Sequence, residues 1–123
     1  MGATVLLIDD APMVSEAVRY VLVNAGYRVV EACDLQHALA ALAAEPVHAA
    51  IVDMQLASES GVALLRRIRE AIPGVKRILM SGAFEEGEPP PKQLEGVADA
   101  ILPKPIDSDE LRETLFRLLK QAP

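Results

Sequence analysis

The chain has 123 residues, which suits one domain with its own hydrophobic core. Its net charge of −6 argues against direct binding to a nucleic-acid backbone, and its apolar stretches are too short to span a membrane. The single cysteine permits no internal disulfide, and no group of cysteines and histidines has the spacing of a zinc site. No signal-peptide pattern precedes the first strand. We therefore expect one cytoplasmic domain, residues 1–123, whose partner is a protein or a cation.

The first half of the chain alternates predicted strands and helices. Residues 4–8 and 28–32 predict short strands, because each is a run of β-forming residues. A helix that begins at Pro12 follows the first strand. A helix capped by Asp34 follows the second strand and ends before Pro46. This alternation is typical of a parallel sheet.

The middle of the chain repeats the pattern and adds an acid. Residues 49–53 form an apolar run that ends abruptly in Asp53, which predicts a buried strand delivering a carboxylate to the edge of a sheet. A polar loop leads to a helix that starts at Gly61. Residues 77–80 predict a fourth strand, and it ends on a polar residue, Ser81.

The last part of the chain departs from the alternation before it returns to it. Residues 82–96 contain the triplet Pro89-Pro90-Pro91, so the fourth helix is expected to be shortened or irregular. Residues 98–102 predict a fifth strand, with Lys104 just beyond its end. Asp107, with a glutamate three residues later, predicts the capped start of a last helix.

Together these elements predict an α/β fold with a three-layer, doubly wound, five-stranded parallel sheet in the flavodoxin-like order 2-1-3-4-5. In that order the first and third strands are neighbours, so Asp9, Asp10 and Asp53 converge in one crevice. Three carboxylates in one place need protons or a hard cation, and an all-oxygen donor set favours Mg²⁺ or Mn²⁺. With the ammonium of Lys104 and the hydroxyl of Ser81 nearby, Asp53 is a candidate nucleophile for phosphoryl transfer.

The ordered set of residues resembles the receiver domain of bacterial two-component response regulators, over essentially the whole chain. The matching residues are Asp9-Asp10, Asp53 with Gly61 eight positions on, Ser81-Gly82 and Lys104-Pro105. The resemblance implies that Asp53 takes a phosphoryl group from a histidine kinase, a phosphotransfer protein or a small acyl phosphate. It implies a signalling domain that assists its own phosphorylation and dephosphorylation, not an enzyme acting on a separate substrate.

The resemblance also implies roles for the neighbours of Asp53. Asp10, Asp53 and the backbone carbonyl of Gln55 would hold Mg²⁺, with Asp9 assisting through water. Lys104 would pair with the phosphoryl group, and its bond to Pro105 would be cis. Ser81 would hydrogen-bond to the phosphoryl group and draw Gly82 and the following loop inward.

Some positions depart from the family pattern. Ile101 stands where the family usually has an aromatic switch residue, so altered coupling between Ser81 and the fifth strand is expected. Ala57 replaces the usual proline after the phosphoacceptor, and Ala11 follows the acid pair where a polar residue is common. The proline triplet disturbs a helix that many receivers use for pairing.

Other interpretations stay open. The chain could be a receiver-like docking domain that acts without phosphorylation, or an aspartate-nucleophile phosphatase resembling the haloacid dehalogenase group. That group has a second acid two residues after the nucleophile, where this chain has Gln55. Asp10 could simply cap the first helix. His37 and His48 are each isolated and are interpreted as non-functional. Both a stand-alone receiver and one linked to a kinase fit the sequence.

Overall fold

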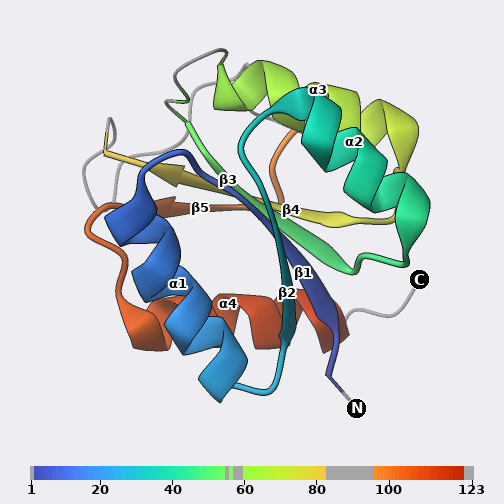
Figure 1. Cartoon of the computed structure of the whole chain (residues 1–123). Coiled ribbons are helices and arrows are strands. Elements are labelled where there is room, and N and C mark those ends of the chain that lie inside the picture. The colour runs from blue at the N-terminus through green and yellow to red at the C-terminus, as the bar shows by residue number, and fades with distance from the viewer. Residues whose placement is uncertain (1, 55, 57–59, 83–95, 121–123) are drawn as a thin grey trace.

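The computed structural model describes residues 2–54, 56, 60–82 and 96–120. These residues form a five-stranded sheet in the order β2-β1-β3-β4-β5, with every neighbouring pair parallel. Helices cover both faces of the sheet (Figure 1). The predicted fold class and strand order are confirmed. The elements are β1 (Thr4–Ile8), α1 (Pro12–Asn24), β2 (Arg28–Ala32), α2 (Leu35–Ala44), β3 (Ala49–Asp53), α3 (Gly61–Ala71), β4 (Lys76–Ser81), β5 (Ala100–Pro103) and α4 (Ser108–Lys120).

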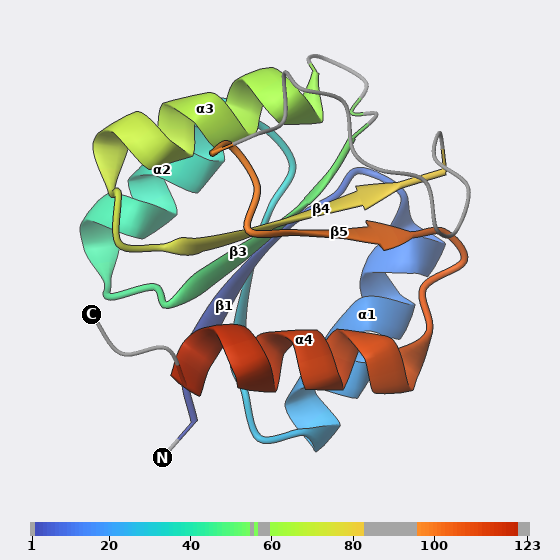
Figure 2. The same cartoon turned by 180° about the vertical axis from the view of Figure 1, so that it is seen from behind.

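The sheet separates two hydrophobic cores because successive side chains of a strand point to opposite faces. In β1, Leu6 and Ile8 pack on the side of α2 and α3, whereas Val5 and Leu7 pack on the side of α1 and α4. Figure 2 shows the two pairs of helices on opposite sides of the strands. All five residues of β1 and of β3 are buried. The central strands β1 and β3 are therefore buried along their whole length, and each lies between two other strands of the sheet.

The ends of the helices follow from local sequence. Gly26 has a φ of 94°, a left-handed conformation that favours glycine, and it ends α1. The next amide, that of Tyr27, donates to the carbonyl of Leu22 at 3.0 Å, as expected for a Schellman motif. The side chain of Asp34 caps α2, as predicted, and that of Asp107 accepts two amide hydrogens at the start of α4.

The interpretation of Asp10 as a helix cap is wrong. The N-cap of α1 is Ala11, and it makes no side-chain capping bond. The side chain of Asp9, not that of Asp10, accepts the amide hydrogen of Ala11, at 2.7 Å. Asp10 lies between the end of β1 and the start of α1, next to Asp9.

The last two strands differ from the prediction at both ends: residues 77–80 and 98–102 were predicted, and the strands span 76–81 and 100–103. β4 already starts at Lys76, and β5 starts only at Ala100. β4 starts at Lys76 because that residue still pairs with Ala49 of β3. Beside β5, the carboxylate of Asp99 accepts the amide hydrogen of Arg77 at 2.7 Å and so takes the place of a ladder carbonyl. The predicted irregular fourth helix lies in residues 83–95, outside the described residues. No helix in the described part of the chain is long and apolar enough to cross a membrane.

Candidate functional site

Four strands carry polar side chains to the carboxyl edge of the sheet. Asp9 follows β1, Asp53 ends β3, Ser81 ends β4 and Lys104 follows β5. Because β3 lies between β1 and β4, Asp53 has one of these groups on either side. Asp53 is 3 % exposed and Ser81 1 % exposed, so both side chains are largely removed from water. Such buried polar groups need partners within the protein or from a ligand.

Lys104 is the cationic partner of Asp53. Its Nζ lies 2.7 Å from Asp53 Oδ2, and its side chain is 29 % exposed against 5 % for that of Asp53. The backbone amide of Lys104 donates to the carbonyl of Ser81 at 2.9 Å, which fixes the start of the loop beyond β5. The bond from Lys104 to Pro105 is cis, as the resemblance implies. The ammonium thus stands at the open end of a nearly buried carboxylate.

Asp9 carries negative charge that the protein only partly compensates. Its Oδ1 accepts the Ala11 amide hydrogen, but its Oδ2 is buried with no hydrogen-bond partner among the described residues. Burial raises the pKa of Asp9, the Ala11 bond opposes that rise, and Asp53 adds to it. Lys104 lowers this pKa and Asp10 raises it. An orphaned anionic oxygen beside two further carboxylates fits a hard divalent cation.

Ser81 is within hydrogen-bond distance of the loop that follows Asp53. Its hydroxyl donates to Met54 Sδ at 3.0 Å. The backbone of Met54 is itself held, because its amide donates to the carbonyl of Met80 at 2.9 Å. The end of β4 is therefore tied to the residue next to Asp53 through both main chain and side chain.

Gly61 explains why a glycine follows Asp53 at a spacing of eight residues. A Cβ at this position would lie 2.1 Å from the carbonyl oxygen of Asp53 and 2.7 Å from the Cα of Met54. The amide of Gly61 donates to the Met54 carbonyl at 2.9 Å. The first turn of α3 can approach the end of β3 this closely only because Gly61 has no side chain.

The remaining predicted residues take more peripheral places. Gly82 is exposed, and a Cβ there would make only ordinary contact, at 4.0 Å, with Lys104. Ile101 is half-buried in β5, opposite Leu79, and packs on the core that faces α2 and α3. Gln55, whose carbonyl is a predicted metal ligand, lies outside the described residues.

Sequence reasoning missed one group of side chains at the same edge. Cys33, Asp34 and His37 come together at the end of β2, with one donor atom from each within 4.8 Å of the others. The signal that could have found it is the helix cap, because the capping carboxylate of Asp34 binds the amide of His37. That bond is the main reason why the pKa of Asp34 lies below its ordinary value. His48, by contrast, has a structural part: its Nδ1 accepts the amide hydrogen of Thr4.

Comparisons with known proteins agree with this arrangement. The family model of the response regulator receiver domain matches residues 5–116. The hydrogenase transcriptional regulatory protein HoxA of Bradyrhizobium diazoefficiens is 33 % identical over 96 % of this chain and 25 % of its own length. The phosphate regulon transcriptional regulatory protein PhoB of Pseudomonas aeruginosa is 30 % identical over 98 % of this chain and 53 % of its own. The chain thus spans between a quarter and about half of these relatives.

Solved structures are similar over nearly the whole chain. A CheY-like response regulator receiver domain from Methanospirillum hungatei has a TM-score of 0.85 and 25 % identity, covering 98 % of this chain and 96 % of that one. The receiver domain of a sensor histidine kinase from Pseudomonas aeruginosa has a TM-score of 0.84 and 25 % identity, covering 98 % and 100 %. That second structure is described with a magnesium ion coordinated in the active site cleft.

Proposed function

The chain belongs to the response regulator receiver domain family, and from this premise we propose that it is a phosphoacceptor domain in which Asp53 receives a phosphoryl group from a histidine kinase or a phosphotransfer protein. The single observation that carries the proposal is the contact between Asp53 and Lys104, at 2.7 Å, at the carboxyl end of the central strand. Ligands of open α/β sheets bind at this edge.

The transfer needs little more than positioning and charge. A carboxylate oxygen of Asp53 forms a bond to phosphorus while the bond between phosphorus and the donor's imidazole nitrogen breaks, and the imidazole then takes up a proton from water. Lys104 already stands beside the attacking carboxylate, so its ammonium can pair with the oxygens of the incoming phosphoryl group. The buried position of Asp53 excludes most water from the nucleophile.

We further propose that Mg²⁺ binds beside Asp53. Asp9, Asp10 and Asp53 would hold it, together with the carbonyl of Gln55. Asp9 Oδ2, which has no hydrogen-bond partner in the described part of the chain, supports this proposal, since a buried anionic oxygen requires a counter-charge. When bound, Mg²⁺ would neutralise the carboxylates and reduce the repulsion that meets an anionic donor. The available donors are oxygens, which suit Mg²⁺ and also admit Mn²⁺.

Phosphorylation would then alter a partner-binding surface, with Ser81 as the first residue to respond. Its hydroxyl lies close to the Asp53 loop, where it bonds to Met54. The partner that responds to phosphorylation is either a linked domain or a separate protein. The histidine kinase that donates the phosphoryl group can itself be covalently linked to this domain. HoxA and PhoB are transcriptional regulators, so one candidate output is control of transcription through a linked DNA-binding domain.

Incubation of the protein with acetyl phosphate and Mg²⁺ tests the site. We expect mass spectrometry to detect one added phosphoryl group, and we expect Asp53→Asn to abolish it. Asp109→Asn is the matched control, because Asp109 is an acid on the exposed side of α4. Omission of Mg²⁺ should strongly reduce the rate. An unchanged phosphoryl mass in Asp53→Asn would contradict the assignment.

A second candidate function is docking without phosphorylation. Ile101 favours it, because an aliphatic side chain half-buried in β5 offers no aromatic ring to exchange places when Ser81 moves. The two functions differ in one measurement. If a partner binds the phosphorylated and unphosphorylated protein with equal affinity, docking without phosphorylation is the better description.

A further inference from the structure

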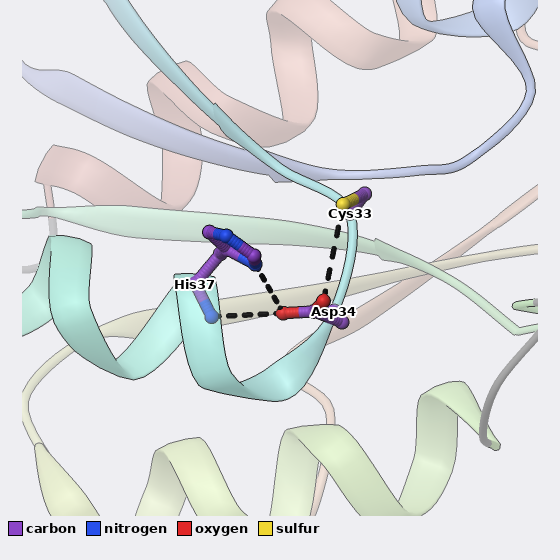
Figure 3. Close-up of polar contacts among 3 residues, drawn as sticks. All are labelled: Cys33, Asp34 and His37. Atoms are coloured by element: carbon purple, nitrogen blue, oxygen red, sulfur yellow. Dashed lines mark hydrogen bonds and ion pairs between the residues drawn. The ribbon is translucent and has the colours of Figure 1, made fainter.

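Outside the Asp53 site, three side chains with different donor atoms meet just beyond the end of β2 (Figure 3). Cys33 Sγ lies 4.0 Å from Asp34 Oδ2, and His37 Nδ1 lies 2.7 Å from Asp34 Oδ1. The donor atoms of the three residues all lie within 4.8 Å of one another. Zinc lies about 2.3 Å from a sulfur ligand and about 2.0–2.1 Å from a nitrogen or oxygen ligand, so two of its ligands lie at most about 4.4 Å apart. The contacts of 4.0 Å and 2.7 Å fall within this limit, and small side-chain rotations would bring all three donor atoms onto one ion.

The local structure holds these atoms together. Asp34 is the N-cap of α2, and its Oδ1 accepts the backbone amide hydrogen of His37 at 2.8 Å. This bond fixes the first turn of the helix, and helical side chains lean back toward the N-terminus, which brings the imidazole over Asp34. The other carboxylate oxygen, Oδ2, faces Cys33. Oδ1 of Asp34 therefore caps the helix, and Oδ2 is the oxygen that can bind a metal ion beside Cys33.

We propose that Cys33, Asp34 and His37 form a binding site for a borderline divalent transition metal, best matched by Zn²⁺, with water as a fourth ligand. Sulfur, imidazole nitrogen and carboxylate oxygen are the ligands that zinc takes in proteins. This donor set differs from that of the Asp53 site, where the candidate ligands are oxygens. The two sites thus select different ions at the same edge of the sheet.

Charge and access agree with this assignment. A thiolate and a carboxylate together neutralise one divalent ion, and the N-terminus of α2 favours the two anionic ligands. Cys33 and His37 are exposed and Asp34 is half-buried, so an ion reaches the site from solvent without opening the fold. On binding, the thiol proton is released to water. The neutral imidazole gives up its contact with Asp34 Oδ1 and carries its proton on Nε2 instead of Nδ1, so that Nδ1 binds the metal.

Titration of the metal-free chain with Co²⁺ provides the test, because a cobalt–thiolate bond gives a charge-transfer band in the near ultraviolet. The chain has one cysteine, so any such band reports Cys33. We expect the band to saturate at one Co²⁺ per chain and to disappear when Zn²⁺ is added in competition. Saturation at half an equivalent would mean that two chains share the ion, and it would overturn the proposal.

Variants separate the three ligands. Cys33→Ser should abolish the band, and His37→Gln and Asp34→Ser should each weaken Co²⁺ binding at least tenfold, with serine preserving the helix cap. Asp107→Ser is the matched control, because it changes the other acidic N-cap, that of α4, and should leave the affinity unchanged. Asp53→Asn should also bind Co²⁺ normally, which separates this site from the proposed phosphoacceptor. The proposal would be overturned if the wild type gave no band. It would also be overturned if His37→Gln and Asp34→Ser bound Co²⁺ as tightly as the wild type does.

Discussion

Arg77 and Asp9 are equally buried charged residues at opposite ends of the sheet, 8 % and 7 % exposed, yet their surroundings differ. Near the amino edge, the Arg77 guanidinium donates to the carbonyls of Val97 at 2.8 Å and Val75 at 3.0 Å. At the carboxyl edge, Asp9 keeps a buried oxygen with no hydrogen-bond partner among the described residues. Arg77 has hydrogen-bond partners within the chain, whereas one oxygen of Asp9 has none among the described residues.

Hydrogen-bond partners distinguish structural from functional polar groups in this fold. A buried group whose hydrogen bonds all go to the backbone stabilises the arrangement that it connects. Arg77 in this way joins the start of β4 to the turn before β5. A buried group left short of partners reduces stability and persists where a ligand completes it. Substitutions at one edge of the sheet should therefore leave the other edge intact.

The largest effect is expected at the amino edge, from Arg77→Met. The variant leaves the buried carbonyls of Val97 and Val75 without donors, so we expect a loss of about 3 kcal/mol in the free energy of unfolding, measured by urea denaturation. Arg67→Met is the control: Arg67 is exposed and makes only a long ion pair within α3, so its loss should change stability by less than about 0.5 kcal/mol. Equal losses in the two variants would remove the contrast between the edges.

Gly61→Ala should produce the next largest effect, at the carboxyl edge. The added methyl group meets backbone atoms of Asp53 and Met54, which cannot rotate away, so we expect about 2 kcal/mol of destabilisation and slower phosphorylation of the folded protein. Gly74→Ala is the matched control, because nothing lies within 4 Å of a Cβ at that position. Thermal unfolding and acetyl phosphate labelling measure the two effects. Unimpaired labelling in Gly61→Ala would show that the close approach does not position Asp53.

Asp9→Asn should stabilise the protein in the absence of metal. The pKa of Asp9 is raised above its ordinary value of 3.8, so the folded state holds its proton more tightly than the unfolded state does. Stability therefore falls as the pH rises from the ordinary pKa through the raised one, and the penalty is complete above it. Asparagine removes the charge and keeps an acceptor for the Ala11 amide. We expect the variant to have a higher free energy of unfolding than the wild type at neutral pH.

Thermal unfolding across the acidic range, without metal, measures this effect. The advantage of Asp9→Asn should shrink as the pH falls toward the ordinary pKa, and added Mg²⁺ should stabilise the wild type more than the variant. Asp109→Asn again serves as an exposed control. A variant less stable than the wild type at neutral pH would mean that Asp9 is not under electrostatic strain.

The smallest change is expected from His48→Ala, at the amino edge. The Thr4 amide loses its acceptor at 2.9 Å, but His48 is exposed, so water replaces much of the bond and the loss should be about 0.5 kcal/mol. His48→Asn offers an amide oxygen close to the position of Nδ1 and should recover most of it. Phosphorylation of Asp53 should be unaffected in both variants, as chemical denaturation and labelling will check.

The fold was predictable because the first three strands are short runs of β-forming residues with clear ends. The runs over residues 4–8, 28–32 and 49–53 match β1, β2 and β3, since each is bounded by charged or small residues that end the apolar stretch. The site followed from one rule, that parallel strands of a doubly wound sheet present their carboxyl ends at a common edge. The contact between Asp53 and Lys104 is what that rule leads one to expect.

What the sequence could not supply depends on side chains that replace backbone partners. Beside β5, the Asp99 carboxylate occupies the amide of Arg77, a bond between residues far apart in the sequence. Cys33, Asp34 and His37 come together because the Asp34 cap fixes the first turn of α2. Their spacing in the sequence does not match that of a zinc site, so a motif search does not find them. The functional roles of all the predicted site residues stay predictions: Asp9, Asp10, Asp53, Gln55, Ser81, Gly82, Ile101, Lys104 and Pro105.

The bond from Ser81 to Met54 bears on how the domain would respond to a signal. A thioether is a weak acceptor, so the hydroxyl gives up little when it leaves sulfur for a charged oxygen. The movement requires rotation about one side-chain torsion and leaves the backbone bond between Lys104 and Ser81 in place. If Asp53 is phosphorylated, we therefore expect the Ser81 hydroxyl to exchange the sulfur of Met54 for a phosphoryl oxygen.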